Sequence, residues 1–166
     1  IDQLRKYNNS FNDFLKNIGQ KPITINDIDI DKNIERLKRF YDSKGYFDSN
    51  ISYDSIIEFN QLTAKYSVET KERYLIDSIT VNIKSRDLDS LYRAHSSESK
   101  IKKGEFFTID KLILERDRLI KLFKNNGIYN FQQRSINYQV LIDSTGNFKK
   151  IPIILNVKDI DQETDY

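Results

Sequence analysis

The only histidine of the chain, His95, is the side chain best suited to proton transfer at neutral pH. A catalytic imidazole needs a nucleophile beside it and a carboxylate that orients it. Asp87 and Asp89 are near in sequence, but both fall on the same short predicted helix without a recognisable catalytic spacing to His95. We therefore expect His95 to be a surface residue and predict no catalytic residue.

An acidic run at Asp27, Asp29 and Asp31 has the alternate spacing that opens a calcium-binding loop. The sixth and twelfth positions of that loop hold Lys32 and Lys38, where the motif has glycine and glutamate. Acids that stabilise a helix N-terminus are the better interpretation. The chain also has no cysteine, and it lacks phosphate-binding glycine loops and the common hydrolase motifs. The sequence therefore predicts no metal, no cofactor and no enzyme.

The charge balance bears on the class of partner. A formal net charge of +2 is too weak a field to indicate nucleic acid. The cluster of Lys100, Lys102 and Lys103 could touch an anionic surface, but three lysines in a chain this charged more often form a solvated loop. No stretch approaches the roughly 18 consecutive apolar residues of a membrane-spanning helix. The start at Ile1 suggests a fragment, with any signal peptide, lipid anchor or membrane domain outside it.

An internal repeat organises the chain. Residues 35–47 and residues 117–129 share an acid, an arginine, a leucine, bulky residues, a glycine and two further bulky residues in the same order. Each glycine follows apolar residues at helical spacing, which are Ile30, Ile34, Leu37 and Tyr41 in the first copy and Ile109, Leu112, Leu119 and Phe123 in the second. Gly45 and Gly127 stand where these helices should end, in the left-handed conformation that glycine adopts without steric cost.

The apolar spacing changes from helical to alternating after each glycine, which predicts a β-hairpin in both copies. Phe47 leads the first hairpin and Phe131 the second, with turns expected at 58–61 and 144–149. In the second copy a strand at 74–84 and a short helix at 87–97 precede the long helix. The first copy has a candidate short helix within 10–18, but its leading strand is missing or degenerate.

The order strand, helix, helix, strand, strand resembles the POTRA domain, and short motifs support this resemblance. Residues 101–107 resemble the family's basic-Gly-x-aromatic entry to the second helix. Residues 115–119 and 126–131 resemble its acid-Arg-x-Arg helix and terminal glycine-aromatic turn, although Ile128 replaces the common tyrosine. Residues 18–23 resemble a segment of the TamA-like lipoproteins of Bacteroidetes, with Gln20 where that group usually has glutamate.

The resemblance implies an α+β fold of two tandem POTRA-like modules, each a small three-stranded mixed sheet covered on one face by two helices. The modules would span 1–71 and 72–160, followed by a tail at 161–166. We expect them to move about a joint near 68–74. The resemblance also implies a BamA/TamA-type protein at the periplasmic face of the outer membrane, with its own C-terminal β-barrel outside this fragment and with no cofactor.

The partners implied by the resemblance are polypeptides: unfolded or partly folded outer-membrane proteins, and assembly proteins of the periplasm or inner membrane. They would bind by β-strand addition, because a sheet edge offers unpaired N–H and C=O groups to any extended chain. By resemblance, the strand after the second helix lies at the edge, at 50–57 in the first module. In the second module it comprises the candidate client-binding residues Arg134, Ser135, Ile136, Asn137, Tyr138, Gln139, Val140, Leu141 and Ile142.

Two other functions remain open at the level of sequence. A periplasmic spacer would hold a barrel or a partner at a set distance without binding clients. A binder of single-stranded nucleic acid on a small α/β sheet is disfavoured by the charge balance.

Overall fold

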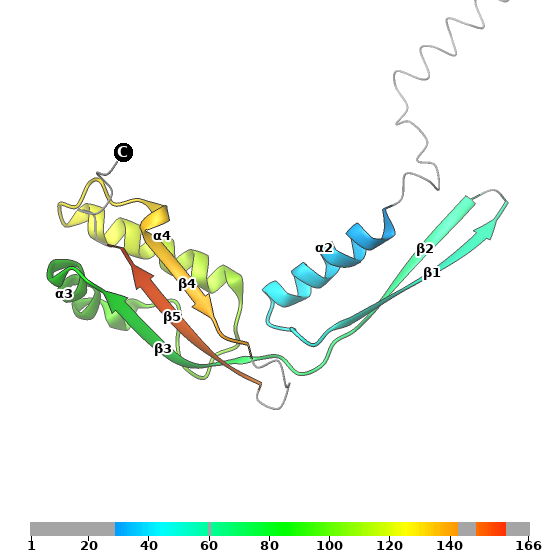
Figure 1. Ribbon diagram of the computed structural model, residues 1–166, viewed down its shortest axis with the longest axis horizontal. Coiled ribbons are helices and arrows are strands. Elements are labelled where there is room, and N and C mark those ends of the chain that lie inside the picture. Colours follow the sequence, from blue (N-terminus) through cyan, green and yellow to red (C-terminus); the bar gives the residue numbers. More distant parts are fainter. Residues whose placement is uncertain (1–28, 60, 143–148, 159–166) are drawn as a thin grey trace, which may run out of the picture.

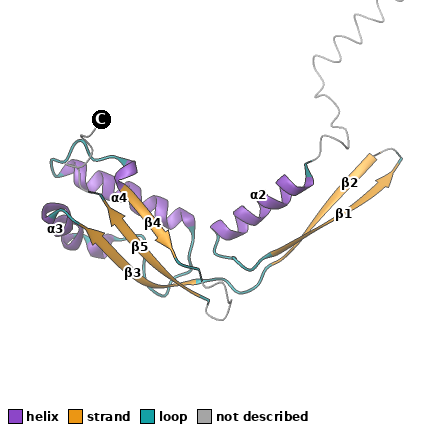
Figure 2. Ribbon diagram, viewed as in Figure 1, coloured by secondary structure: helices purple, strands orange, loops and turns teal. Residues whose placement is uncertain are grey.

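The computed structural model describes residues 29–59, 61–142 and 149–158. Within these ranges the chain forms two units, and each contains a helix followed by two antiparallel strands, as the repeat predicts (Figure 1). The first unit is a helix followed by a β-hairpin. The second unit is a small sheet with two helices, and Figure 2 shows it apart from the first hairpin.

The second unit has the predicted element order. Strand β3 (Leu75–Ile83) is followed by helix α3 (Arg86–Ala94), helix α4 (Ile109–Asn125), strand β4 (Ile136–Val140) and strand β5 (Lys150–Val157). The strand order is β3-β5-β4, with β5 parallel to β3 and antiparallel to β4. The sheet is therefore three-stranded and mixed, and the α+β class is confirmed.

The core of the second unit lies between the sheet and its two helices. The central strand β5 alternates between buried and partly exposed residues, which is typical of a sheet with one covered face. Its four buried side chains pack in two clusters against Leu88 of α3 and Leu112, Leu119 and Phe123 of α4. Burying this many large apolar side chains is the main stabilising contribution available to so small a unit.

The first unit has much less buried surface among the described residues. Helix α2 (Ile30–Ser43) and strand β1 (Asn50–Glu58) contain no buried residue, and β1 pairs with β2 (Gln61–Glu69) in a two-stranded sheet. The hairpin turn falls at the predicted place. The short helix expected within 10–18 and any leading strand lie outside the described residues.

Both aromatic residues expected to lead the hairpin strands instead lie before those strands begin. Phe47 precedes β1 and Phe131 precedes the 3-10 turn η3 (Gln133–Ser135) that leads into β4. Phe131 packs against its own helix, with 4.7 Å between its ring centroid and that of Phe123. The prediction of strand at these two positions was wrong, because Phe131 packs against the helix that precedes it and Phe47 packs against Tyr74 and Phe107 of the second unit.

The two predicted helix ends are confirmed. Gly45 and Gly127 have φ angles of +90° and +92°, in the left-handed region. The amide after each glycine donates back to the last helical turn, from Tyr46 to the Tyr41 carbonyl at 3.0 Å and from Ile128 to the Phe123 carbonyl at 3.1 Å. The interpretation of the acidic run also holds for Asp29, whose carboxylate caps α2 by accepting from the Lys32 amide at 2.9 Å.

The helix end at Gly45 is also the contact between the units. The Gly45 carbonyl accepts a hydrogen bond from the Tyr74 amide at 2.9 Å, just before β3 begins. Phe47 inserts its ring between Tyr74 and Phe107, with centroid distances of 5.3 and 5.4 Å. An aromatic side chain of the first unit thus becomes part of the core of the second unit. The predicted module boundary at 71/72 falls in the connection between β2 and β3, beside this contact.

Charged side chains surround the same contact, which we call the joint. Asp48 accepts hydrogen bonds from Lys149 and from the Tyr74 hydroxyl, and the Lys149 contact holds the pKa of Asp48 below its ordinary value. Arg73 donates from Nε to the Lys44 carbonyl at 2.7 Å and stacks over Phe106 at 4.9 Å. These contacts favour a fixed orientation of the units over free movement about the 68–74 connection.

The two glycines provide a matched test of the joint. A Cβ at Gly127 would meet no atom within 4 Å, whereas a Cβ at Gly45 would lie 2.7 Å from the Phe107 carbonyl oxygen. Both alanine variants incur the backbone strain of positive φ, about 1 to 2 kcal/mol. We expect Gly45→Ala to unfold at a lower denaturant concentration than Gly127→Ala. Because only the Gly45 substitution disturbs the contact between the units, it alone should widen the range of interatomic distances measured by small-angle scattering. Equal effects of the two substitutions would contradict the close contact at Gly45.

The lowered pKa of Asp48 predicts a pH dependence. The stabilisation is present above the pKa of unfolded aspartate, about 3.9, and is lost as pH falls through the lower folded value. Between about pH 5 and pH 2 the parent should therefore lose more stability than Asp48→Asn in denaturant titrations. Asp54→Asn, which removes an exposed carboxylate from β1, is the control. A parent and an Asp48→Asn variant with parallel pH profiles would rule out this contribution.

Candidate functional site

Strand β4 forms one edge of the sheet in the second unit. It pairs only with β5, and the described ranges contain no strand on its other side. At the opposite edge, the first residues of β3 are covered by a loop. The Ile76 amide donates to the Glu105 carbonyl at 2.8 Å, and the Phe107 amide donates to the Tyr74 carbonyl at 3.0 Å. The β4 edge has no such cover among the described residues.

Two hydrogen bonds that flank β4 establish which backbone groups are open. The Leu141 amide donates to the Pro152 carbonyl, and the Lys158 amide donates to the Ser135 carbonyl. In an antiparallel pair, alternate residues turn both backbone groups toward the partner. Asn137 and Gln139 therefore face β5. The N–H and C=O groups of the intervening residues, Ile136, Tyr138 and Val140, face outward from the edge.

The structure divides the predicted client-binding segment into three parts. Arg134 and Ser135 belong to the turn η3, residues 136–140 form β4, and Leu141 and Ile142 follow the strand. Pro152 explains why pairing stops at this point, because the Leu141 carbonyl faces a residue that has no N–H to donate. The usable edge is thus shorter than the sequence predicted.

The side chains of β4 leave its edge unprotected. The strand reads Ile-Asn-Tyr-Gln-Val and contains none of the lysines or prolines that usually prevent strand addition. Asn137 and Gln139 are exposed on the uncovered face of the sheet, and Ile136 is buried on the covered face. The alternation of polar and apolar side chains fixes the register of this strand.

A recess of about 490 Å³ opens beside the start of β4. It is lined by Arg116 of α4, by Gln132, Gln133 and Arg134 of the turn, and by Ile136. The guanidinium of Arg116 lies over the Tyr138 ring, 5.6 Å from its centroid. Arg116, Gln132 and Gln133 were not among the candidate site residues that the sequence predicts. Arg116 lies within the acid-Arg-x-Arg segment at 115–119, but only the packing of α4 shows that it contacts the edge strand.

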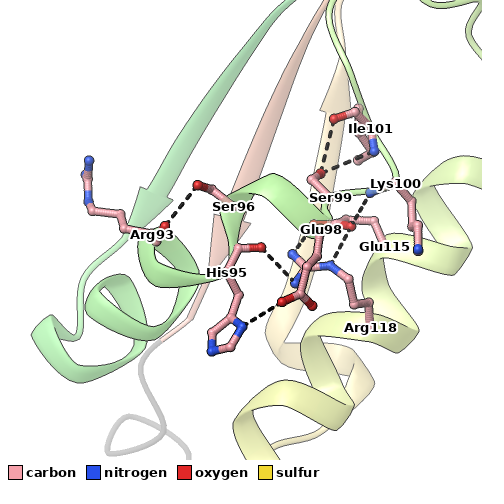
Figure 3. Close-up of polar contacts among 9 residues, drawn as sticks. All are labelled: Arg93, His95, Ser96, Glu98, Ser99, Lys100, Ile101, Glu115 and Arg118. Carbon is pink, nitrogen blue, oxygen red and sulfur yellow. Dashed lines mark hydrogen bonds and ion pairs between the residues drawn. The ribbon is translucent and has the colours of Figure 1, made fainter.

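A buried ion pair fixes α4 against the loop that precedes it (Figure 3). Glu115 is 1% exposed and accepts two hydrogen bonds from the Arg118 guanidinium, at 2.7 and 2.9 Å. It also accepts from the Lys100 amide at 2.7 Å, and Arg118 donates to the His95 carbonyl at 3.3 Å. The acid-Arg-x-Arg pattern of the sequence therefore has a structural role here, since each charge of the pair is hydrogen-bonded where it is buried.

His95 contacts the neighbouring Glu98 side chain (Figure 3). Its Nδ1 lies 2.8 Å from a Glu98 carboxylate oxygen, and this contact lowers the pKa of Glu98. Both side chains are substantially exposed, at 40% and 58%. The described residues include no group of histidine and acidic side chains that could hold a metal ion. Lys100, Lys102 and Lys103 are exposed, in agreement with a solvated loop.

Comparison by sequence identifies no family. No protein-family model matches the chain, and a search of curated proteins gives no match. No helix in the described ranges is long and apolar enough to span a membrane.

The solved structures that are similar to this chain include three with TM-scores below 0.5. POTRA domains 3–5 of Haemophilus influenzae BamA give a TM-score of 0.45 at 16% identity, over 79% of this chain and 48% of that chain. Haemophilus ducreyi BamA lacking POTRA domains 1–3 gives 0.47 at 14% identity, over 78% and 23%. POTRA domains 1–3 of Anabaena Omp85 give 0.41 at 15% identity, over 90% and 58%. This chain spans less than two thirds of each, and likenesses at this level support no argument about function.

The ion pair of Figure 3 predicts an asymmetry between two variants. Arg118→Met would leave the Glu115 carboxylate buried without its cation, which costs about 3 to 5 kcal/mol. Glu115→Gln keeps an acceptor for the Lys100 amide and leaves Arg118 free to reach solvent, so we expect a smaller loss. Chemical denaturation of both variants measures the difference. If Glu115→Gln lowered the free energy of unfolding more than Arg118→Met, the buried carboxylate would not be the member of the pair that needs its partner more.

Proposed function

We propose that this chain is a pair of POTRA-type modules of a BamA/TamA-type outer-membrane protein, and that the second module binds extended polypeptides by strand addition at β4. The sequence repeat and the β-α-α-β-β order of the second unit support the class of module. The open backbone groups of Ile136, Tyr138 and Val140 are the observation that supports binding.

Backbone recognition suits a partner that has not yet folded. An added strand gains hydrogen bonds along the main chain, so its affinity depends little on its sequence. Unfolded or partly folded outer-membrane proteins and assembly proteins are the partners that we propose, at the periplasmic face of the outer membrane. The proposed role is binding without catalysis and without a cofactor.

A spacer is the second candidate, and the joint is the observation that favours it. A spacer must transmit a fixed orientation, which the insertion of Phe47 beside Tyr74 and the charged contacts of Asp48 would provide. The two functions differ in one respect that can be measured, because a spacer needs no open edge at β4.

Two proline variants separate client binding from folding. Val140→Pro removes an outward N–H and leaves the pairing with β5 in place, so it should weaken binding of an extended peptide about threefold to tenfold. Gln139→Pro removes an N–H that faces β5 and should instead lower stability by about 3 kcal/mol. Peptide titration followed by fluorescence anisotropy, with denaturation of each variant, measures both effects.

The control for lost side-chain packing is Val140→Ala, which keeps the N–H and should bind as the parent does. The ligand is a urea-unfolded outer-membrane protein or an extended peptide that alternates apolar and polar residues. Binding that survives Val140→Pro unchanged would count against the β4 edge and for the spacer.

A further inference from the structure

We infer that the recess beside β4 binds a carboxylate of the added strand, so that the edge selects extended polypeptides carrying a negative charge at one position. This inference rests on the proposed strand addition and adds to it the chemistry of the ligand. The recess is formed by Arg116, Gln132, Gln133, Arg134 and Ile136.

The recess offers hydrogen-bond donors. Arg116 and two glutamines whose amides can donate line it, and none of its five lining residues is acidic. Guanidinium groups bind planar carboxylates through paired N–H donors, and such charge-assisted hydrogen bonds are roughly twice as strong as neutral ones. A carboxylate is therefore the group that fits this lining best.

The Arg116 guanidinium has an unused donor. Its Nε is buried and donates to no acceptor in the described part of the chain. The ring of Tyr138 lies under the same guanidinium, and its hydroxyl is also buried without a described partner, so burial raises the pKa of this phenol. Buried polar atoms of this kind are uncommon in proteins. A small rotation of the Arg116 side chain toward an acceptor in the recess would satisfy the Nε–H.

The position of the recess links it to the edge. Ile136 is the first residue of β4, lies on the covered face of the sheet and lines the recess. An added strand places alternate side chains on that same face. The residue of the added strand that lies beside Ile136 would therefore point its side chain, or its terminal carboxylate, toward Arg116. A C-terminal carboxylate and an acidic side chain present the same chemistry here.

The test uses one extended peptide of alternating polar and apolar residues in four forms. The first has a free C-terminal carboxylate, the second a C-terminal amide, the third a C-terminal amide with one internal glutamate, and the fourth replaces that glutamate with glutamine. Each is titrated at constant ionic strength against the parent chain and against Arg116→Gln, Arg116→Lys and Lys121→Gln. Lys121 is an exposed residue of the same helix and controls for the loss of one positive charge.

We expect one carboxylate form to bind the parent about tenfold more tightly than its neutral counterpart. If the free C-terminus binds more tightly than the amide, the bound group is the terminal carboxylate; if the glutamate form binds more tightly than the glutamine form, it is an acidic side chain. Arg116→Gln should abolish the preference. Arg116→Lys should retain only part of it, because lysine lacks the paired donors of arginine. Lys121→Gln should keep it in full.

Three results would overturn the inference, and they differ in what they say of strand addition. Equal affinity for charged and neutral peptides would refute carboxylate binding in the recess, while strand addition at β4 would still stand. A preference that Lys121→Gln lowers as much as Arg116→Gln also refutes the recess, because it reports only the net charge. If no form of the peptide binds the parent, the recess and the proposed function are both refuted.

Discussion

The pairing of β5 with both β3 and β4 is the interaction on which the second unit depends. It puts an apolar strand in the centre of the sheet, where its alternate side chains reach both helices. The same pairing leaves β3 and β4 as the two edges. A three-stranded sheet has two edges, and among the described residues a loop covers only the beginning of one of them. The unprotected edge at β4 is thus a direct consequence of how the core is built.

The joint uses the helix end of the first unit for a second purpose. Gly45 ends α2 in a conformation that its counterpart Gly127 shares, but only Gly45 lies against the backbone of the other unit. The absence of a side chain there lets the Gly45 carbonyl reach the Tyr74 amide and brings Phe47 to the core. One repeated motif therefore serves as a simple helix end in one copy and as an inter-unit contact in the other.

Neighbouring charged residues of α4 differ in whether their charge is paired. Glu115 and Arg118 face the loop before α4 and satisfy each other where they are buried. Arg116, the residue after Glu115, contacts Tyr138 of β4 instead. Its Nε–H has no acceptor in the described part of the chain. The difference follows from helix geometry, since consecutive side chains lie about 100° apart around the axis. A run of charged residues can thus fix a loop on one side and supply a binding group on another.

The sequence by itself determined the local structure: the repeat, the helix ends at Gly45 and Gly127, the first hairpin turn and the element order of the second unit. Each of these depends on residues close together in the chain, through helical spacing, alternation or the backbone freedom of glycine. The tertiary structure alone decided that Phe47 packs at the joint, that β4 is open only at alternate residues and that Arg116 lines a recess beside it. These features join residues distant in sequence, and no local pattern specifies which face of a helix or strand meets a given partner.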